Sequence, residues 1–253
     1  MQRGFDSKVA LVTGASSGIG RASARAFARE GASVVVADVM VEGGQETVRL
    51  IEGTGGEAIF VEADVSNAKE VEALIERAVG AYGRLDYAFN NAGIDGVMAT
   101  TAQCTEENWN HTLNTNLKGV WLCMKYEIPQ LLRQGGGAIV NSSSAAGLVG
   151  VPNLPAYAAS KHGILGLTKT AALEYARTGI RVNAVCPGVI RTPGVERYIS
   201  GREELEAQFT ALEPVGRMGT PDEVAGAVVW LCSEAASFVT GHAMSVDGGV
   251  VAG

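Results

Sequence analysis

The sequence predicts an α/β protein in which a parallel β-sheet carries helices on both faces. Short apolar segments alternate with segments of helical length along the chain, and repeated strand–helix units of this kind form parallel sheets. The first strand runs into a glycine-rich turn, and the other polar clusters also fall where strands end. No linker or shift in composition divides the 253 residues, so we expect one domain.

The first repeat consists of a strand, a glycine turn and a helix. The apolar segment 8–13 leads into T-G-A-S-S-G-I-G, and an Ala-rich helix follows at 21–30. Gly14, Gly18 and Gly20 let the backbone approach a pyrophosphate, whose charge the free N–H groups at the helix start would stabilise. The spacing G-x-x-x-G-x-G differs from the commoner G-x-G-x-x-G. A plain tight turn is the alternative, but the flanking strand and helix favour a nucleotide site.

The second strand, at 33–37, ends in Asp38. In a nucleotide-binding βαβ unit, a carboxylate about 20 residues after the glycines binds the adenosine ribose hydroxyls. A surface aspartate in a turn is the alternative reading. The position at the end of a strand favours the ribose contact.

The alternation continues to the end of the chain. A long helix carries Asn116 at its middle, where asparagine competes for backbone hydrogen bonds and therefore predicts a functional role or a kink. Thr220 and Pro221 have the residue types expected at a helix start. The remaining expected elements are helix 43–53, strand 57–61, helix 67–82, strand 85–89, helix 106–133, strand 138–141, helix 155–177, strand 180–186, a helix to 232 and strand 243–246.

Tyr157 and Lys161 carry the chemistry that we expect of this chain. Residues four apart share one face of a helix, and a nearby ammonium should lower the pKa of the phenol from about 10 towards neutrality. Tyr157 is then a candidate general acid/base, and the hydroxyl of Ser144 would hold a substrate oxygen against it. Such pairs also occur by chance, so the interpretation depends on the nucleotide site at the N-terminal end.

The segment 193–215 interrupts the alternation. It carries apolar residues between charged ones: Val195, Tyr198, Ile199, Phe209 and Leu212. This pattern fits a lid over a substrate cleft. It fits the buried face of an ordinary short helix equally well, and the sequence leaves both readings open.

Composition excludes several classes of function. A net charge of -7 and a pI near 5.1 argue against nucleic-acid binding. Four cysteines without C-x-x-C spacing and only three histidines argue against a structural metal. No leader-like start and no apolar run of membrane-spanning length is present, so we expect a cytoplasmic protein with reduced thiols and no membrane contact.

The ordered motifs T-G-x-x-x-G-I-G, strand-end Asp, D-V, N-N-A-G, central Asn, Ser, Y-x-x-x-K and P-G-x-x-x-T together resemble the short-chain dehydrogenase/reductase family across essentially the whole chain. The resemblance implies a Rossmann-type sheet of seven parallel strands in the order 3-2-1-4-5-6-7. It implies hydride transfer between NAD and a secondary alcohol or its ketone. The implied catalytic tetrad is Asn116, Ser144, Tyr157 and Lys161, and the family's usual thirteen-residue gap to the tyrosine selects Ser144 from three adjacent serines.

The resemblance also implies a role for each residue. Tyr157 exchanges the proton, Ser144 orients the substrate oxygen, Lys161 tunes Tyr157 and holds the nicotinamide ribose, and Asn116 anchors a water relay. The implied cofactor-binding residues are Gly14, Ser17, Gly18, Ile19, Gly20, Asp38, Asp64, Val65, Asn91, Ala92, Gly93, Tyr157, Lys161, Pro187, Gly188, Ile190 and Thr192.

The cofactor should be NAD rather than NADP. Asp38 would repel a 2′-phosphate, and neither Ser17 nor Val39 supplies a base to offset the repulsion. Arg21 is the nearest base in the sequence, but its direction cannot be derived from sequence.

Substrate and assembly rest on weaker patterns. The stretch 122–128, L-C-M-K-Y-E-I, loosely resembles family members that oxidise alicyclic diols, although packing on a helix would also explain it. Relatives commonly form homotetramers through helices that correspond to 106–133 and 155–177. A carrier-protein-linked 3-ketoacyl reductase, expected to use NADP, and a non-catalytic nucleotide-sensing domain remain as alternatives, and the complete Ser, Tyr and Lys set disfavours the second.

Overall fold

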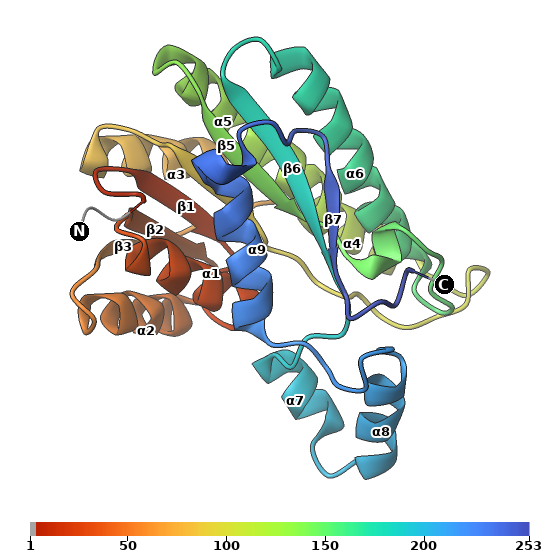
Figure 1. Ribbon diagram of the computed structural model, residues 1–253. Helices are drawn as coiled ribbons and strands as arrows, with labels where there is room; N and C mark the ends of the chain where they lie inside the picture. The colour runs from red at the N-terminus through yellow and green to blue at the C-terminus, as the bar shows by residue number, and fades with distance from the viewer. Residues whose placement is uncertain (1–3, 253) are drawn as a thin grey trace.

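The computed structural model describes residues 4–252, and its centre is a seven-stranded parallel sheet (Figure 1). The strand order is β3-β2-β1-β4-β5-β6-β7, which confirms the order that the family resemblance implies. Because all strands are parallel, their carboxyl ends meet at one edge, where ligands bind in such sheets. The strands are β1 Val9–Thr13, β2 Ser33–Asp38, β3 Glu57–Glu62, β4 Tyr87–Asn90, β5 Gly137–Ser142, β6 Ile180–Pro187 and β7 Ala243–Val246.

Helices connect the strands and cover the sheet. Their ends follow from the sequence where a cap is present: Thr220 and Glu223 form a capping box before α9, with Pro221 in its first turn, as the sequence predicts. The helices are α1 Gly18–Arg29, α2 Val41–Glu52, α3 Ala68–Tyr82, α4 Glu106–Leu113, α5 Gly119–Arg133, α6 Pro155–Tyr175, α7 Pro193–Ile199, α8 Glu203–Ala211 and α9 Pro221–Cys232.

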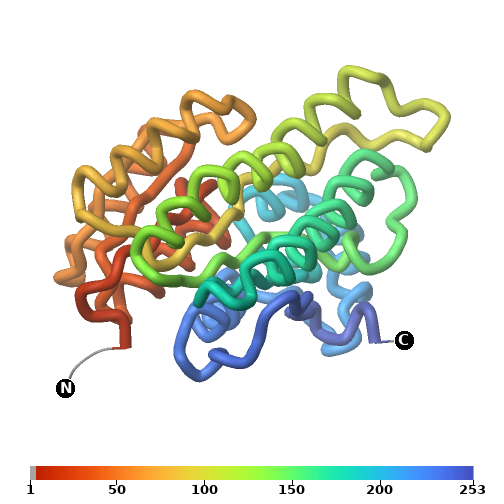
Figure 2. The backbone as a smooth tube through the Cα atoms, turned by 90° about the horizontal axis from the view of Figure 1, so that it is seen from above, coloured from red at the N-terminus to blue at the C-terminus, as the bar shows by residue number. Residues whose placement is uncertain are grey.

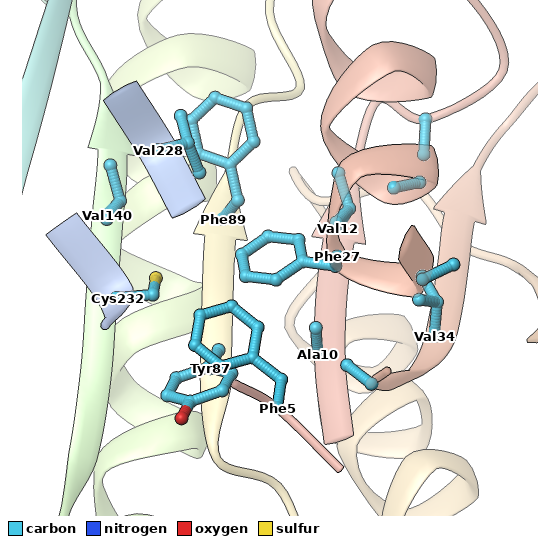
Figure 3. Close-up of a cluster of buried hydrophobic side chains, with 14 of the residues drawn as sticks. Phe5, Ala10, Val12, Phe27, Val34, Tyr87, Phe89, Val140, Val228 and Cys232 are labelled. Carbon is cyan, nitrogen blue, oxygen red and sulfur yellow. The ribbon is translucent and has the colours of Figure 1, made fainter. Parts of the chain in front are cut away.

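Two apolar layers hold the helices against the sheet. On one face, α1 and α9 pack on the strands, and the rings of Phe27, Tyr87 and Phe89 gather between β1 and β4 (Figure 3). The Phe27 and Tyr87 rings are stacked, with centroids 6.1 Å apart. On the other face, residues of α3, α5 and α6 pack against the same strands. Burial on both faces explains why the central strands read as nearly continuous apolar runs.

The predicted helix 106–133 contains an irregular turn at its candidate functional residue. A π-helical turn, Asn114–Lys118, separates α4 from α5, and the Asn116 side chain lies buried in it. A π-turn widens the helix by one residue and is frequent at functional sites. The kink or functional role predicted for Asn116 thus coincides with a real distortion of the helix.

The segment 193–215 contains two short helices that project from the carboxyl edge of the sheet (Figure 1). The two helices pack on each other, and the rings of Tyr198 and Phe209 stack with centroids 6.0 Å apart. Helix α8 buries none of its residues, whereas Ile199 of α7 is buried. Of the five apolar residues of the segment, Tyr198 and Phe209 thus pair across the two helices, whereas Leu212 is exposed.

Three features bear on the excluded functions. Within residues 4–252, no helix has both the length and the apolar character needed to cross a membrane. The same residues hold no group of three or more His, Cys, Asp or Glu side chains placed to bind a metal ion. All four cysteines are free thiols.

Candidate active site

The glycine turn after β1 and the N-N-A-G segment after β4 are joined into one structure. Thr13 Oγ1 accepts hydrogen bonds from the backbone N–H groups of Asn91 at 3.0 Å and Ala92 at 3.1 Å. Asn91 Nδ2 donates to the carbonyls of Thr13 at 3.1 Å and Gly14 at 3.2 Å. A Cβ atom on Gly14 would lie 2.8 Å from Ala92 Cα, so only glycine permits this approach.

The start of α1 has the properties of an anion site. Ser17 is the N-cap residue but makes no side-chain cap hydrogen bond, and the first turn holds no acidic residue. A Cβ atom on Gly20 would lie 2.1 Å from the Gly14 carbonyl oxygen, and one on Gly18 would lie 3.2 Å from Thr192 Cγ2. The predicted residues Gly14, Ser17, Gly18, Gly20 and Thr192 thus meet around uncapped N–H groups, which fit a pyrophosphate.

Asp38 lies beside this turn at the end of β2. One carboxylate oxygen accepts the Ser16 N–H and the other the Met40 N–H, both at 2.9 Å. The side chain is largely buried. Each oxygen of an ionised carboxylate has two lone pairs, so the carboxylate retains acceptor capacity for ribose hydroxyls.

The structure also answers the question of where Arg21 points. Its guanidinium donates to the carbonyls of Ser16 and Gly43 and to Thr47 Oγ1. These contacts tie the glycine turn to α2. Arg21 is therefore engaged by backbone and hydroxyl oxygens next to Asp38.

The remaining predicted cofactor residues line the same edge. Asp64 Oδ1 accepts the Ser66 N–H at 2.8 Å, and the buried Val65 packs against Gly119 at the start of α5. Gly188 and Ile190 follow β6, where the Gly188 N–H donates to the Val246 carbonyl and Ile190 bridges Gly219. The predicted cofactor-binding residues outside the tetrad lie at or after the carboxyl ends of β1, β2, β3, β4 and β6. They include Ile19, Ala92, Gly93 and Pro187.

The four residues of the implied tetrad converge at this edge from three segments. Lys161 Nζ donates to the Ser142 carbonyl at 2.8 Å and lies 5.5 Å from the centroid of the Tyr157 ring. Gly93 lies between the tetrad members: a Cβ atom there would be 3.2 Å from Asn116 Oδ1 and 3.6 Å from Lys161 Nζ. The N-N-A-G segment therefore lies directly against Asn116 and Lys161.

The three adjacent serines have different environments. Ser142 and Ser143 are buried, and Ser143 Oγ donates to the Lys161 carbonyl at 2.9 Å. Ser144 is only partly buried, caps the short turn Ala145–Gly147 and hydrogen-bonds Tyr157. Ser144 is thus the least buried of the three serines, and its catalytic role stays a prediction.

The predicted pKa shift of Tyr157 is wrong. Burial raises the pKa of Tyr157 to about 12; the hydrogen bond with Ser144 lowers it, and the charge of Asp95 raises it further. Burial also lowers the pKa of Lys161 to about 8, against the opposing charge of Asp95. Sequence spacing reveals the neighbouring ammonium but not the desolvation, which is the largest cause of the shift. At neutral pH Tyr157 keeps its proton, a state suited to donating it to a ketone oxygen.

Sequence reasoning missed several residues that shape the site. Ser160 Oγ accepts a hydrogen bond of 3.1 Å from Asn116 Nδ2. Thr13 anchors the N-N-A-G segment. Asp95 places a charge near both Tyr157 and Lys161. Thr13 had a signal, since it is a polar residue at a strand end. The stretch 122–128 lies on α5, where Leu122, Cys123 and Met124 are buried, so packing accounts for these three residues.

Comparison with known proteins places the chain among enzymes. A family model described as enoyl-(acyl carrier protein) reductase matches residues 14–251. Cyclohexanol dehydrogenase from Acinetobacter sp. (strain SE19) is 46% identical over 248 residues, covering 98% of this chain and 96% of that enzyme. The 2,5-dichloro-2,5-cyclohexadiene-1,4-diol dehydrogenase from Sphingobium indicum is 42% identical over 246 residues, covering 97% of each chain.

A solved structure gives the same result for the fold. The crystal structure of levodione reductase matches with a TM-score of 0.92 at 37% identity, covering 97% of this chain and 98% of that one. Fold, motifs and relatives together define an oxidoreductase. The chain belongs to the short-chain dehydrogenase/reductase family.

Proposed function

We propose that this protein is an NAD-dependent dehydrogenase of alicyclic secondary alcohols that also reduces the corresponding ketones. The observation that carries the proposal is the convergence of Ser144, Tyr157 and Lys161 beside the glycine turn at one edge of the sheet. The named substrates of two similar enzymes are cyclic alcohols, cyclohexanol and a cyclohexadiene diol. These substrates support the proposal that this protein acts on alicyclic alcohols.

The residues of the edge would divide the work as follows. The bound cofactor would accept the hydride as NAD when an alcohol is oxidised and supply it as NADH when a ketone is reduced. Its pyrophosphate would lie at the start of α1 and its adenosine ribose at Asp38. Ser144 would orient the substrate oxygen, and Tyr157 would give a proton to that oxygen or take one from it. The positive charge of Lys161 would favour the phenolate when an alcohol is oxidised.

The choice of NAD over NADP follows from Asp38. Two like unit charges ~4 Å apart repel by about 4 kcal/mol at an effective dielectric of about 20, and each ~1.4 kcal/mol is tenfold in binding. A 2′-phosphate next to Asp38 would suffer this repulsion. Arg21 is engaged by oxygens of the glycine turn and α2, and the neighbours of Asp38, Val39 and Met40, are exposed and uncharged. We therefore expect a preference for NAD of about 10² or more.

We also propose the homotetramer and the lid. A shallow groove between the α4–α5 segment and α6, which run side by side in Figure 2, is lined by Leu113, Leu117, Trp121, Gly163, Gly166 and Leu167. An exposed apolar groove of this kind fits burial against a second copy. Helices α7 and α8 would cover the substrate end of the cleft.

The function is tested by turnover. Cyclic and linear secondary alcohols would be offered with NAD, and the corresponding ketones with NADH, while the absorbance of NADH is followed. We expect the cyclic alcohols to give the highest catalytic efficiencies. Absence of turnover with every alcohol and ketone would reject the proposal, and preference for linear alcohols would reject its alicyclic part.

A further inference from the structure

The loop that follows the N-N-A-G segment is fixed at two points by asparagine side chains. Asn116 Oδ1 accepts the Ile94 N–H at 2.8 Å, and Asn116 Nδ2 donates to the Ile94 carbonyl at 2.8 Å. Three residues later, Asn108 Oδ1 accepts the Val97 N–H at 2.8 Å, and Asn108 Nδ2 donates to the Val97 carbonyl at 2.9 Å. Both backbone polar groups of Ile94 and of Val97 are therefore held by side chains of the α4 region.

The two residues between these clamps have little freedom. Gly96 has a φ of +73°, and a Cβ atom there would lie 2.5 Å from Thr112 Oγ1, so its conformation requires glycine. Asp95 precedes it and follows Ile94. The backbone of Asp95 is thus held in place although the loop belongs to no helix or strand.

Asp95 lies at the catalytic edge. Gly93, two residues earlier, lies beside Asn116 Oδ1 and Lys161 Nζ. The charge of the Asp95 carboxylate acts on both Tyr157 and Lys161, because it raises the pKa of each. The position in the chain and the electrostatic influence agree that the carboxylate is near the two groups proposed to move the proton.

The carboxylate has no structural task within residues 4–252. Asp95 is exposed, and among the side chains and backbone groups described there, none donates a hydrogen bond to it or forms an ion pair with it. Asp38, by comparison, is satisfied by two backbone N–H groups. A carboxylate on a fixed backbone beside a catalytic pair, without a protein partner, is free to bind a ligand group.

We propose that Asp95 is a specificity-determining residue that accepts a hydrogen bond from a second hydroxyl of the substrate. An ionised carboxylate only accepts hydrogen bonds, so it favours a substrate with a donor besides the reacting alcohol. It also repels a negative charge. The enzyme should prefer ring diols to the ring mono-alcohol and should disfavour ring alcohols that carry a carboxylate.

This inference rests on the proposed function, because it names a preference within the alicyclic alcohols. A site that hydrogen-bonds a substrate hydroxyl discriminates against the analogue that lacks it, and a hydrogen bond to a charged group is stronger than a neutral one. In a cleft that is partly open to water, we expect kcat/KM for the best diol to exceed that for cyclohexanol by about tenfold.

The test compares Asp95→Asn with the unmutated enzyme on three kinds of probe. These are cyclohexanol, the 1,2-, 1,3- and 1,4-cyclohexanediols, and 4-hydroxycyclohexanecarboxylate, each with saturating NAD. Glu72→Gln serves as control, because it removes one exposed carboxylate from α3, outside the candidate site. Equilibrium binding of the same probes to the protein–NADH complex, measured by thermal shift, accompanies the kinetics.

We expect the unmutated enzyme to favour at least one diol over cyclohexanol and to use the carboxylate probe least. In Asp95→Asn the ratio of kcat/KM for the best diol to that for cyclohexanol should fall about tenfold, and the penalty on the carboxylate probe relative to cyclohexanol should shrink. Glu72→Gln should leave all ratios unchanged. If the ratios of kcat/KM for the diols and for the carboxylate probe to that for cyclohexanol are the same in Asp95→Asn and the unmutated enzyme, the inference is overturned.

The binding arm separates the inference from the proposed function. If no probe is turned over but the diols bind better than cyclohexanol, and this difference disappears in Asp95→Asn, then the proposed function fails and the role of Asp95 stands. If the diols bind no better than cyclohexanol to the unmutated complex, the inference is overturned whatever the turnover.

Discussion

Replacement of Glu127 by glutamine should make the protein more stable at alkaline pH. Glu127 lies on α5 and is completely buried. It accepts a hydrogen bond of 3.1 Å from Asn90 Nδ2, which also donates to Asn141 Oδ1 on the neighbouring strand at 3.1 Å. Among the described residues, Glu127 Oε1 and Asn90 Oδ1 have no hydrogen-bond partner. A neutral carboxylic acid suits this environment better than an ion, because burial penalises the charge.

The magnitude follows from the pKa. Burial raises the pKa of Glu127 from 4.5 to about 8, while the hydrogen bond from Asn90 lowers it. Below pH 4.5 both the folded and the unfolded chain keep the proton. Between pH 4.5 and about 8 only the folded chain keeps it, so the free energy of unfolding falls by about 1.4 kcal/mol per pH unit. Above about pH 8 the loss levels off, at about 5 kcal/mol in total.

Glutamine has nearly the same shape and does not titrate in this range. The assay is urea unfolding of Glu127→Gln and of the unmutated protein at fixed protein concentration from pH 5 to pH 9, with the exposed Glu76→Gln as control. The stability difference between Glu127→Gln and the unmutated protein should grow with pH and reach several kcal/mol, while Glu76→Gln follows the unmutated protein. Parallel pH profiles for all three proteins would refute the reasoning.

Three further predictions concern cofactor, lid and assembly. Asp38→Asn removes the charge but keeps an acceptor, so the ratio of kcat/KM with NAD to that with NADP should fall by about tenfold or more; an equal ratio in both enzymes would show that Asp38 does not face the ribose. Tyr198→Ala and Phe209→Ala break the stacked pair between α7 and α8 and should raise KM for the alcohol more than KM for NAD; equal rises would contradict a lid. Light scattering at micromolar protein should give the mass of four chains, and Trp121→Glu in the α4–α6 groove should lower it; a monomeric mass before mutation would reject the assembly.

The sequence was most informative where a residue type has few structural explanations. The glycine turn, Asp38 at a strand end and the Thr220–Pro221 helix start are all found where the sequence predicts them. The strand order came from the family resemblance, because apolar runs alone do not say which strands are neighbours. The helix 106–133 was correct in extent, but its π-helical turn depends on the tertiary contacts of Asn116 with Ile94 and Ser160.

Burial explains most of what the sequence could not reveal. The pKa of Tyr157 moved in the direction opposite to the prediction, because desolvation by burial is the largest cause of its shift. Glu127 reads as a surface residue of an amphipathic helix until its contact with Asn90 is known. No motif spacing in the sequence points to Asp95. Its position depends on Asn108 and Asn116, which lie 13 and 21 residues further along the chain and hold the loop on either side of it.

The most direct test of the account is the replacement Tyr157→Phe, with Tyr175→Phe on the same helix as control. Tyr157→Phe keeps the ring but removes the only proton carrier proposed for the substrate oxygen, so turnover of a cyclic alcohol with NAD should fall by about 10² or more. Binding of NADH, followed by its fluorescence, should stay within about threefold, and Tyr175→Phe should keep full turnover. A Tyr157→Phe enzyme that retains most of its turnover would contradict the proposed proton transfer.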